Sequence, residues 1–355
     1  MSAGVCAMGG DAVENAFGRV RGLLLDGVCD DGVVSWLERI EGALGGALPK
    51  EPQAAWLDGA FGAGVGAGAG ALLGPCADVL GRGGKRWRPL LACLVCEALG
   101  GGEGALPLAP LVELCHNASL IHDDIEDGST LRRGLPAAHV LYGVDAALNA
   151  GCFLYFLPLM RIDGLEASAE FKLSVYSLWA LTMRRLHLGQ SLDIDWHRGG
   201  AAPSVEEYYA MCALKTGSLA RFAVELGARA VELGGCAAAD GDLVEGLALR
   251  AERLGVGFQV LDDVRNLICG VPGKERGDDV VEGKMSLPVL LFLRSGGAER
   301  REFVGRCFAA ARVGGVGVPE VGLLIEALQG SGALEEAERE ARGLLSFEAA
   351  YGAAP

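Results

Sequence analysis

The spacing of apolar residues is the feature that most limits how this chain can fold. Within residues 27–48, Val33, Trp36, Ile40 and Leu44 recur at intervals of three or four, which places them on one face of a helix. The same spacing returns in five further segments: residues 108–122, 168–188, 205–213, 218–233 and 243–267. Runs of Val and Ile that alternate with polar residues, as in half-buried strands, are absent. The pattern therefore predicts an all-α protein.

The breaks between these helical segments are short. Glycine and proline interrupt the pattern at residues 100–104, 161–164, 198–203, 234–241, 270–277 and 314–319. Connections of this length predict one continuous domain over residues 1–355, and no repeat of fixed period is present. The glycine-rich stretch at residues 61–71 lacks the GxxxxGK[ST] pattern of a phosphate-binding loop, so we interpret it as a flexible connection.

Charge and hydropathy disfavour several classes of function. The formal net charge is −15, which disfavours binding to nucleic acid and to anionic membrane surfaces. No apolar run free of charge and repeated glycine reaches the roughly 18 residues of a membrane-spanning helix. The amino terminus also lacks the basic start and apolar run of a signal peptide. These features predict a soluble, cytoplasmic protein.

Cysteine usage points the same way. The chain has 11 cysteines, an odd number without a regular framework, which predicts reduced thiols. Cys93 and Cys96 form a lone CxxC, which suits either a redox or zinc site or a buried helix face where cysteine acts as a small apolar residue. We favour the buried face, because the surrounding segment is mostly apolar.

The strongest chemical signal is an acidic cluster. Asp123 and Asp127 are four residues apart and share a helical face, with Asp124 beside them. A solvated acidic helix end is one interpretation. However, the largely apolar run at residues 114–121 leads directly into these acids, which favours a buried helix that ends at a cavity. Carboxylates in this arrangement suit Mg²⁺, which keeps water ligands and is completed by substrate phosphates.

A second acidic pair, Asp262 and Asp263, follows another apolar helical segment at residues 254–261. Two aspartate-bearing helices that face each other would hold several divalent metal ions between them. One diphosphate would then bridge those ions.

Basic residues are gathered beside these acids. Lys85, Arg86 and Arg88 lie within four positions, Arg132 and Arg133 follow the first acidic cluster, and further lysines stand at 215, 274 and 284. Arginine and lysine are the side chains that phosphate recognition requires. Each group alone suits a solvated surface, but their alternation with two metal-type acidic motifs indicates diphosphate binding.

Six segments in a fixed order resemble the trans-isoprenyl diphosphate synthases, the polyprenyl synthetase family. They are GGKRWRP (83–89), HNASLIHDDIEDGSTLRRGLPAAH (116–139), GQSLDID (189–195), KTGSL (215–219), FQVLDDVRN (258–266) and GKERGDDVVEGKMSLP (273–288). Residues 1–75 and the tail after 296 carry no such motif. The resemblance implies a single large helical bundle of the isoprenoid synthase type with a central active-site cavity.

The resemblance also assigns roles to residues. It implies that the two aspartate motifs bind several Mg²⁺ ions, with the ligands Asp123, Asp124, Asp127, Asp262 and Asp263. It implies an allylic diphosphate site formed by Arg132, Lys215, Thr216, Gln259, Lys274 and Lys284. It implies a site for isopentenyl diphosphate formed by Lys85, Arg88, His116 and Arg133.

The chain departs from the commonest family pattern at one position. The second motif reads DDxxN, with Asn266 where many members have Asp, and the substitution would weaken one metal contact. This DDxxN motif is similar to the second motif of geranylgeranyl diphosphate synthases of the eukaryotic type. His122, directly before the first aspartates, is more similar to bacterial members.

The activity implied is condensation of isopentenyl diphosphate with an allylic diphosphate, and the family is expected to form homodimers. Ala118 and Ser119, one turn before Asp123, are small, which leaves a tunnel open for a twenty-carbon, geranylgeranyl product. Farnesyl and longer-chain synthases stay as alternatives. A non-catalytic subunit of a heteromeric synthase is a further alternative, but it would be expected to lose motif aspartates, and all five are present. A terpene cyclase is disfavoured, because it would not need the basic segment at residues 83–89 or Arg133, which serve a second diphosphate.

Overall fold

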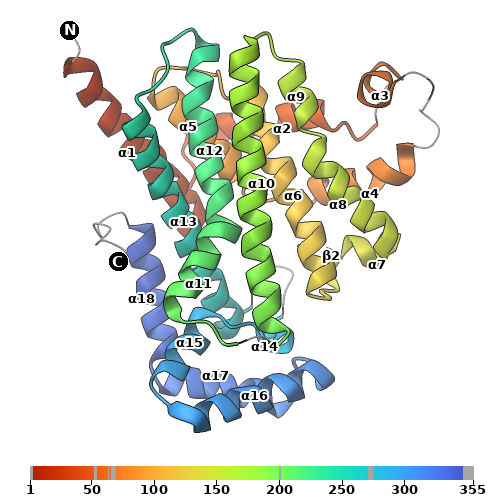
Figure 1. Ribbon diagram of the computed structural model, residues 1–355, viewed down its shortest axis with the longest axis vertical. Helices are drawn as coiled ribbons and strands as arrows, with labels where there is room; N and C mark the ends of the chain where they lie inside the picture. Colours follow the sequence, from red (N-terminus) through yellow and green to blue (C-terminus); the bar gives the residue numbers. More distant parts are fainter. Residues whose placement is uncertain are drawn as a thin grey trace. The chain divides into compact units, whose positions relative to one another are not determined.

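The computed structural model describes residues 3–51, 54–62, 64, 69–199, 201–270 and 275–346. Their secondary structure is almost entirely helical (Figure 1). A single two-stranded hairpin, β1 (Leu131–Arg132) and β2 (Leu135–Pro136), is the strand structure within these residues. The prediction of an all-α fold is confirmed.

The chain divides by its contacts into two compact units. Unit 1 comprises Met1–Thr130, Pro136–Thr182 and Leu219–Ala248, and unit 2 comprises Leu131–Leu135, Met183–Ser218 and Leu249–Pro355. The long helices α10 (Ala169–His197) and α13 (Gly241–Ile268) contribute residues to both units.

The helices of unit 1 surround α6 (Ala109–Glu126), which packs against α8 (Val144–Phe156) and α5 (Trp87–Ala98). The other elements of this unit are α1 (Ala3–Leu25), α2 (Asp31–Ala47), α3 (Ala54–Phe61), α4 (Ala69–Gly81), η2 (Leu106–Leu108), α7 (Ala138–Tyr142), α9 (Leu159–Asp163), α12 (Ser218–Arg229) and η4 (Ala230–Gly234).

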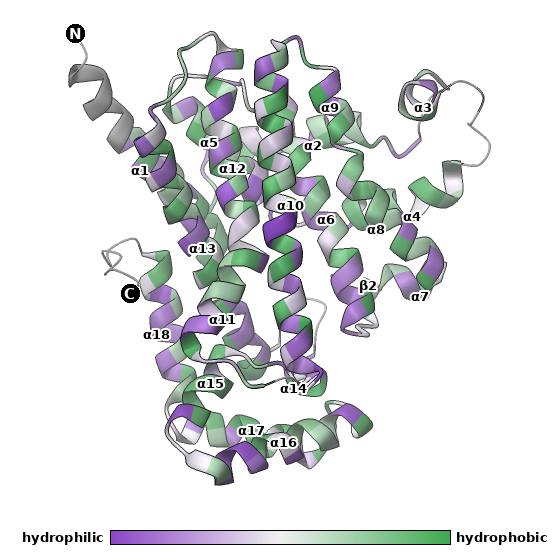
Figure 2. Ribbon diagram, viewed as in Figure 1, coloured by the Kyte–Doolittle hydropathy of each residue, from purple (hydrophilic) through white to green (hydrophobic). Residues whose placement is uncertain are grey.

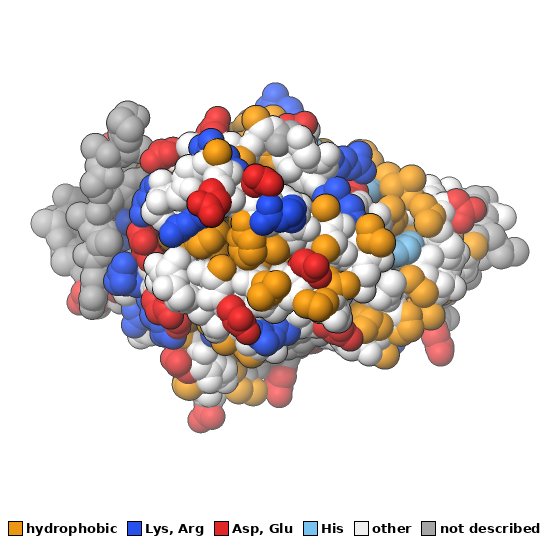
Figure 3. Space-filling model, turned by 90° about the horizontal axis from the view of Figure 1, so that it is seen from below, with side chains coloured by type: hydrophobic (Ala, Val, Ile, Leu, Met, Phe, Trp, Pro, Cys, Tyr) orange, Lys and Arg blue, Asp and Glu red, His pale blue; other side chains and the backbone are white. Residues whose placement is uncertain are grey.

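Unit 2 holds the end of the chain. Its elements besides the hairpin are α11 (Val205–Cys212), η3 (Ala213–Gly217), α14 (Asp278–Glu282), α15 (Leu287–Arg294), α16 (Gly297–Gly314), α17 (Pro319–Gly330) and α18 (Ala333–Leu345). Helix α15 is almost entirely buried and packs against α11, α16, α17 and α18. Figure 3 shows the α16–α17 end from below, where acidic and basic side chains surround a group of hydrophobic ones.

Capping and amphipathic spacing explain where the helices form. Helix α2 begins after Asp30, whose side chain accepts a hydrogen bond from the Val33 backbone N–H at 2.8 Å. Its apolar stripe, including Trp36 and Ile40, is buried as the spacing predicts. Helix α11 begins with a capping box between Ser204 and the third residue of the helix. In Figure 2, hydrophobic and hydrophilic residues alternate along the helices of each unit, as expected for helices with one apolar and one polar face.

Several boundaries differ from the sequence prediction. The helix predicted at residues 108–122 continues to Glu126, because the acidic motif forms its last turns. The helix predicted at 168–188 extends to His197, and the predicted break at 161–164 is partly taken up by α9. The hairpin was not predicted, because two-residue strands are too short to show an alternating pattern.

Cys93 and Cys96 lie fully buried on α5, where burial raises the pKa of each thiol, that of Cys96 to about 11. This agrees with a packed helix face. No cysteine with a described side chain forms a disulfide. In the described part of the chain, no helix combines the length and the apolar character needed to cross a bilayer.

Candidate active site

The first acidic motif lies in the last turns of α6. Asp124 is only 3% exposed, whereas Asp123 and Asp127 are partly exposed. Asp127 is the C-cap residue, and its backbone N–H donates to the Asp123 carbonyl oxygen at 2.8 Å. Because the carboxyl end of a helix carries partial negative charge, it repels these three carboxylates. Cations bound at this position would offset that repulsion.

Helix α8 packs closely against His122, the residue that precedes these acids. A Cβ atom on Gly151 would approach the His122 Cε1 atom to 2.6 Å, so only glycine leaves room for the imidazole. The His122 Nδ1 atom lies 2.9 Å from the Ala118 carbonyl oxygen, and its ring lies 5.5 Å from that of Tyr155. Burial raises the pKa of Tyr155, and the negative charge of Asp123 raises it further, so the phenol stays protonated.

The residues predicted to border the product chain lie on α6 as well. Ala118 is fully buried. Ser119 is partly exposed, and its hydroxyl donates to the His116 carbonyl oxygen at 2.8 Å. The sequence offers three aromatic candidates for a floor that would stop chain growth, Phe153, Tyr155 and Phe156 on α8. Phe156 is 60% exposed and Phe153 is partly exposed, whereas Tyr155 is buried against α6. An exposed ring cannot close a buried tunnel, so Tyr155 is the better candidate.

The basic segment at residues 83–89 forms a tight turn before α5. Gly84 has a φ of 134° and Arg86 a φ of 48°, both in the region that disfavours side chains with a Cβ atom. Arg86 forms ion pairs with Glu113 at 2.8 Å and Glu41 at 2.7 Å. Burial opposes the charge of Arg86, but the two glutamates outweigh it and raise its pKa. Arg86 therefore anchors the turn from inside.

Lys85 and Arg88, predicted to bind isopentenyl diphosphate, flank this anchored residue. Lys85 is exposed, and its Nζ atom donates to the Leu24 carbonyl oxygen at 2.8 Å. Arg88 is buried, and its guanidinium lies 4.5 Å from the centroid of the neighbouring tryptophan ring. His116 lies on α6, one turn beyond the glutamate that pairs with Arg86. The ion pair thus ties the turn that carries Lys85 and Arg88 to the helix that carries His116.

The hairpin presents the two remaining arginines. Arg132 ends β1, and Arg133 and Gly134 form a two-residue loop with φ values of 55° and 77°. Positive φ at both loop residues is typical of a type I′ turn. Among the described residues, Arg86 and Arg133 are the non-glycine residues with positive φ. Backbone strain of this kind concentrates at functional sites.

In unit 2, Lys215 and Thr216 lie on η3, a single π-helical turn, which is a frequent feature of functional sites. A Cβ atom on Gly189 would approach the Lys215 backbone nitrogen to 2.3 Å, so glycine allows α10 to contact this turn. The Lys215 Nζ atom donates to Asp193 at 2.7 Å. Burial opposes ionisation of Asp193, but Lys215 and Lys284 outweigh it and lower its pKa to about 2.

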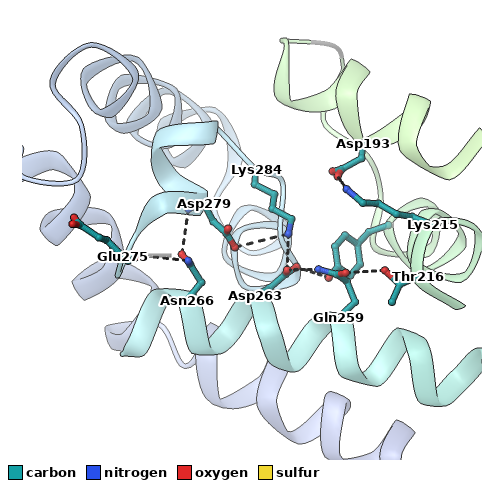
Figure 4. Close-up of polar contacts among 10 residues, drawn as sticks. Asp193, Lys215, Thr216, Gln259, Asp263, Asn266, Glu275, Asp279 and Lys284 are labelled. Atoms are coloured by element: carbon teal, nitrogen blue, oxygen red, sulfur yellow. Dashed lines mark hydrogen bonds and ion pairs between the residues drawn. The ribbon is translucent and has the colours of Figure 1, made fainter. Parts of the chain in front are cut away.

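One face of α13 carries a line of polar side chains, Gln259, Asp263 and Asn266 (Figure 4). Asp263 is 1% exposed and accepts hydrogen bonds from Tyr208 at 2.7 Å, Lys284 at 2.8 Å and Gln259 at 2.9 Å. Gln259 in turn accepts a hydrogen bond from the Thr216 hydroxyl at 2.8 Å. The carboxylate of Asp263 is therefore held by three donors from different parts of unit 2.

Lys284 is the cation at the centre of this network. Its Nζ atom lies 2.8 Å from Asp263 and 3.9 Å from Asp279. Burial opposes its charge, but Asp263, Asp279 and Asp193 outweigh that effect and hold its pKa well above the usual value. The ammonium group therefore stays charged and remains close to Lys215, which pairs with the same Asp193.

The structure gathers much of the predicted allylic diphosphate set. Thr216, Gln259 and Lys284 are linked by hydrogen bonds through Asp263. Lys215 pairs with Asp193, which also feels the charge of Lys284, and Arg132 belongs to the same unit. Lys274 lies outside the described residues. Asp262, next to Asp263, is partly exposed.

The two aspartate motifs belong to different compact units, so a diphosphate bridge between them stays a prediction. Within the described part of the chain, no three His, Cys, Asp or Glu side chains converge as a complete metal site. The assignment of Arg133, Lys85, Arg88 and His116 to one pocket also stays a prediction.

Sequence reasoning missed several residues of this region. Asp193 lies in the segment at 189–195 that supports the family resemblance, and its acidic side chain there was the available signal. Asp279 directly follows Asp278 in the segment at 273–288, and this acidic pair gave a similar signal. Tyr208 and Glu113 gave none, because a tyrosine or a glutamate in a helical stripe has many possible partners.

Comparison with known proteins identifies the family. The sequence matches the polyprenyl synthetase family over residues 70–313, which is more than half of the chain. The chain belongs to this family. The match covers both aspartate motifs and all the basic segments discussed above.

The chain is similar to a geranylgeranyl pyrophosphate synthase of Apiospora sacchari, with 37% identity over 187 residues, 52% of each chain. It thus spans about half the length of the curated relatives it matches. The structure is similar to that of a geranylgeranyl pyrophosphate synthetase from Pyrococcus horikoshii, with a TM-score of 0.73, 25% identity and coverage of 93% of this chain and 90% of that one. A polyprenyl synthase from Caulobacter crescentus, solved with calcium and isoprenyl diphosphate, has a TM-score of 0.68, 25% identity and coverage of 88% and 90%.

The ion pair between Asp193 and Lys215 predicts a dependence of stability on pH. The pKa of Asp193 near 2 lies below its ordinary value of 3.8, so its contribution is present above that value and is lost as the pH falls toward 2. Replacing Asp193 with Asn should lower the free energy of unfolding at neutral pH by about 2 kcal/mol, as for a hydrogen bond between charged groups. The variant should then lose less stability than the wild type between about pH 4 and pH 2.

The matched control for this prediction is Asp195→Asn, because Asp195 is exposed on the same helix. Denaturant titrations at several pH values measure all three proteins. The same pH slope for Asp193→Asn, Asp195→Asn and the wild type would contradict the prediction.

Proposed function

We propose that this protein is a trans-prenyltransferase that condenses isopentenyl diphosphate with an allylic diphosphate. The observation that carries the proposal is the half-buried group of contacts in which Lys215 pairs with Asp193 and Lys284 pairs with Asp263, beside Thr216 and Gln259. Two ammonium groups with adjacent hydroxyl and amide donors suit a diphosphate. Membership of the polyprenyl synthetase family supports this assignment.

The reaction needs no protein nucleophile. The bond between the allylic carbon and the diphosphate oxygen breaks, a new carbon–carbon bond forms to isopentenyl diphosphate, and a proton leaves the product. Lys215, Lys284 and Arg132 bind the departing diphosphate and stabilise the negative charge that develops on it. Lys85, Arg88, His116 and Arg133 hold the second diphosphate so that its double bond faces the allylic carbon.

The donor set suits Mg²⁺. Carboxylate oxygens are its preferred protein ligands, and the ion keeps waters and substrate oxygens, so it needs only one or two carboxylates from the protein. Asp123, Asp124 and Asp127 lie at the negative end of α6, where bound cations would offset the repulsion. When bound, the metal ions would neutralise charge on the departing diphosphate.

In the second motif the carboxylates of the two aspartates have different surroundings. Asp263 already accepts three hydrogen bonds from protein groups, whereas Asp262 is partly exposed. We assign the larger metal contribution to Asp262. The calcium-bound structure of the polyprenyl synthase from Caulobacter crescentus supports a metal site in this fold.

We propose geranylgeranyl diphosphate as the product, with farnesyl and longer chains as alternatives. The names of similar proteins and the small residues Ala118 and Ser119 support this choice. All five motif aspartates are present, which disfavours a non-catalytic subunit. The homodimer and the cytoplasmic location stay predictions from the resemblance.

The first test is an incubation of the full chain with Mg²⁺, isopentenyl diphosphate and each allylic diphosphate, followed by product sizing. Asp123→Ala and Asp262→Ala should each lower turnover about 100-fold or more, because loss of a group that stabilises the leaving diphosphate has costs of that size. EDTA should abolish activity and added Mg²⁺ restore it. The exposed Asp195→Ala is the control and should keep wild-type turnover. Full activity in EDTA would exclude the metal mechanism.

The division of the cations predicts opposite effects on the two substrates. Lys85→Gln should raise the KM for isopentenyl diphosphate about tenfold and leave that for the allylic substrate nearly unchanged, because one charged hydrogen bond is lost. Lys215→Gln should do the reverse while keeping a donor to Asp193. Steady-state kinetics with each substrate varied in turn provide the measurement. Equal effects on both constants would show that the assignment is wrong.

The tunnel assignment predicts a change of product length. Ala118→Phe should shorten the main product by at least one five-carbon unit, because the ring occupies space needed by the chain. Ala118 is fully buried, so this change also costs about 1–3 kcal/mol through overpacking. Ser119→Phe, at a partly exposed position, tests the same tunnel with less strain, and Ser119→Ala is its control. Two active Phe variants with an unchanged product would refute the assignment.

A further inference from the structure

Asn266, the residue that departs from the common family pattern, is 2% exposed on the polar face of α13. Its side-chain Nδ2 atom donates to the Glu275 carbonyl oxygen at 3.3 Å, and its Oδ1 atom accepts the Asp279 backbone N–H at 3.2 Å. Its own carbonyl oxygen accepts the Gly277 backbone N–H at 3.1 Å. Figure 4 shows Asn266 directed toward Glu275 and Asp279. Each of these partners is a backbone group of one loop.

This loop, residues 275–279, leads into α14 and from there to Lys284. The Lys284 backbone N–H donates to the Asp279 carbonyl oxygen at 2.9 Å, so the lysine is tied to the residue that Asn266 holds. The Glu275 backbone N–H donates to the Asp278 side chain at 2.7 Å, which closes the loop internally. Gly277 has a φ of 88°, and a Cβ atom there would approach Val321 to 2.6 Å. The loop therefore has a defined conformation, docked on α13 through Asn266.

We propose that Asn266 is a positioning residue that docks the 275–279 loop on α13 and so places Lys284 for the departing diphosphate. The second motif then has two different ends, a carboxylate end at Asp262 and an amide end at Asn266. This inference rests on the proposed function for the role of Lys284. The docking itself is a structural property that is measured without substrate.

The chemistry of the contacts requires an amide. An ionised carboxylate at this position accepts hydrogen bonds but donates none, so the Glu275 carbonyl oxygen would lose its donor and face a negative charge. The surroundings are already acidic, because Asp263 and Asp279 are buried nearby and share the charge of Lys284. A third buried carboxylate would compete for that ammonium group and displace it from the diphosphate position. Asn therefore fits this loop better than Asp.

The test is Asn266→Asp, which restores the residue that many family members have. If Asn266 docks the loop, amide hydrogen exchange at residues 275–284 should rise about tenfold, as for a lost hydrogen bond. The KM for the allylic diphosphate should rise by a similar factor, and the Mg²⁺ concentration for half-maximal activity should not fall. If the position is a metal site, Asn266→Asp should lower that Mg²⁺ concentration and leave hydrogen exchange unchanged, which would overturn the proposal.

Two further variants make the result decisive. Asp262→Asn, on the same helix, should raise the Mg²⁺ requirement without faster exchange at residues 275–284, because Asp262 is assigned to metal. Asn266→Ala removes both side-chain bonds without adding charge and should increase exchange as Asn266→Asp does. Unchanged exchange in both Asn266 variants would refute the docking role. If the wild-type protein transfers no prenyl group, the proposed function fails, while the exchange measurement still decides whether Asn266 docks the loop.

Discussion

The buried carboxylate of Asp263 is the group on which the arrangement of unit 2 depends. A charge that is 1% exposed is stable only when its partners are fixed. Here the partners come from α11, from the preceding turn of α13 and from the segment after α14. Satisfying one carboxylate therefore holds three elements together, and it keeps the half-buried Lys284 charged. The same interaction thus stabilises unit 2 locally and keeps the Lys284 ammonium group charged.

In unit 1 the buried charge is positive, and acidic side chains neutralise it. The buried guanidinium of Arg86 is neutralised by Glu113 and Glu41, and this fixes a turn whose backbone is strained. Arg86 and Arg133 both have positive φ, and both belong to the basic segments. A strained backbone persists only where the surroundings compensate for it. The ion pair of Arg86 is such compensation, and it holds Lys85 and Arg88 on either side of the turn.

The helices could be predicted from the sequence, and so could the candidate residues that gather in unit 2, because helical periodicity and the six family segments are local patterns. The charge pattern alone did not separate Arg86 from Lys85 and Arg88, and only the family resemblance assigned Lys85 and Arg88, without Arg86, to a substrate. The sequence did not show that Arg86 pairs with Glu113 and Glu41, because these partners lie far from it along the chain. It also treated Asn266 as a weaker Asp, because the partners of its amide lie in a loop nine to thirteen residues away. The hairpin was missed because its two-residue strands carry no periodicity.

Helix geometry explains why each acidic motif has two adjacent aspartates with different surroundings. Successive residues of an α-helix point about 100° apart, so neighbours cannot share one environment. In the first motif Asp124 is buried and Asp123 is partly exposed, and in the second Asp263 is buried and Asp262 is partly exposed. Asp263, the buried member of the second pair, accepts hydrogen bonds from protein donors. Asp262 lies on the more exposed side of the helix. A doubled aspartate on a helix thus combines one buried carboxylate with one that is partly exposed, and this division is independent of the residue that ends the motif.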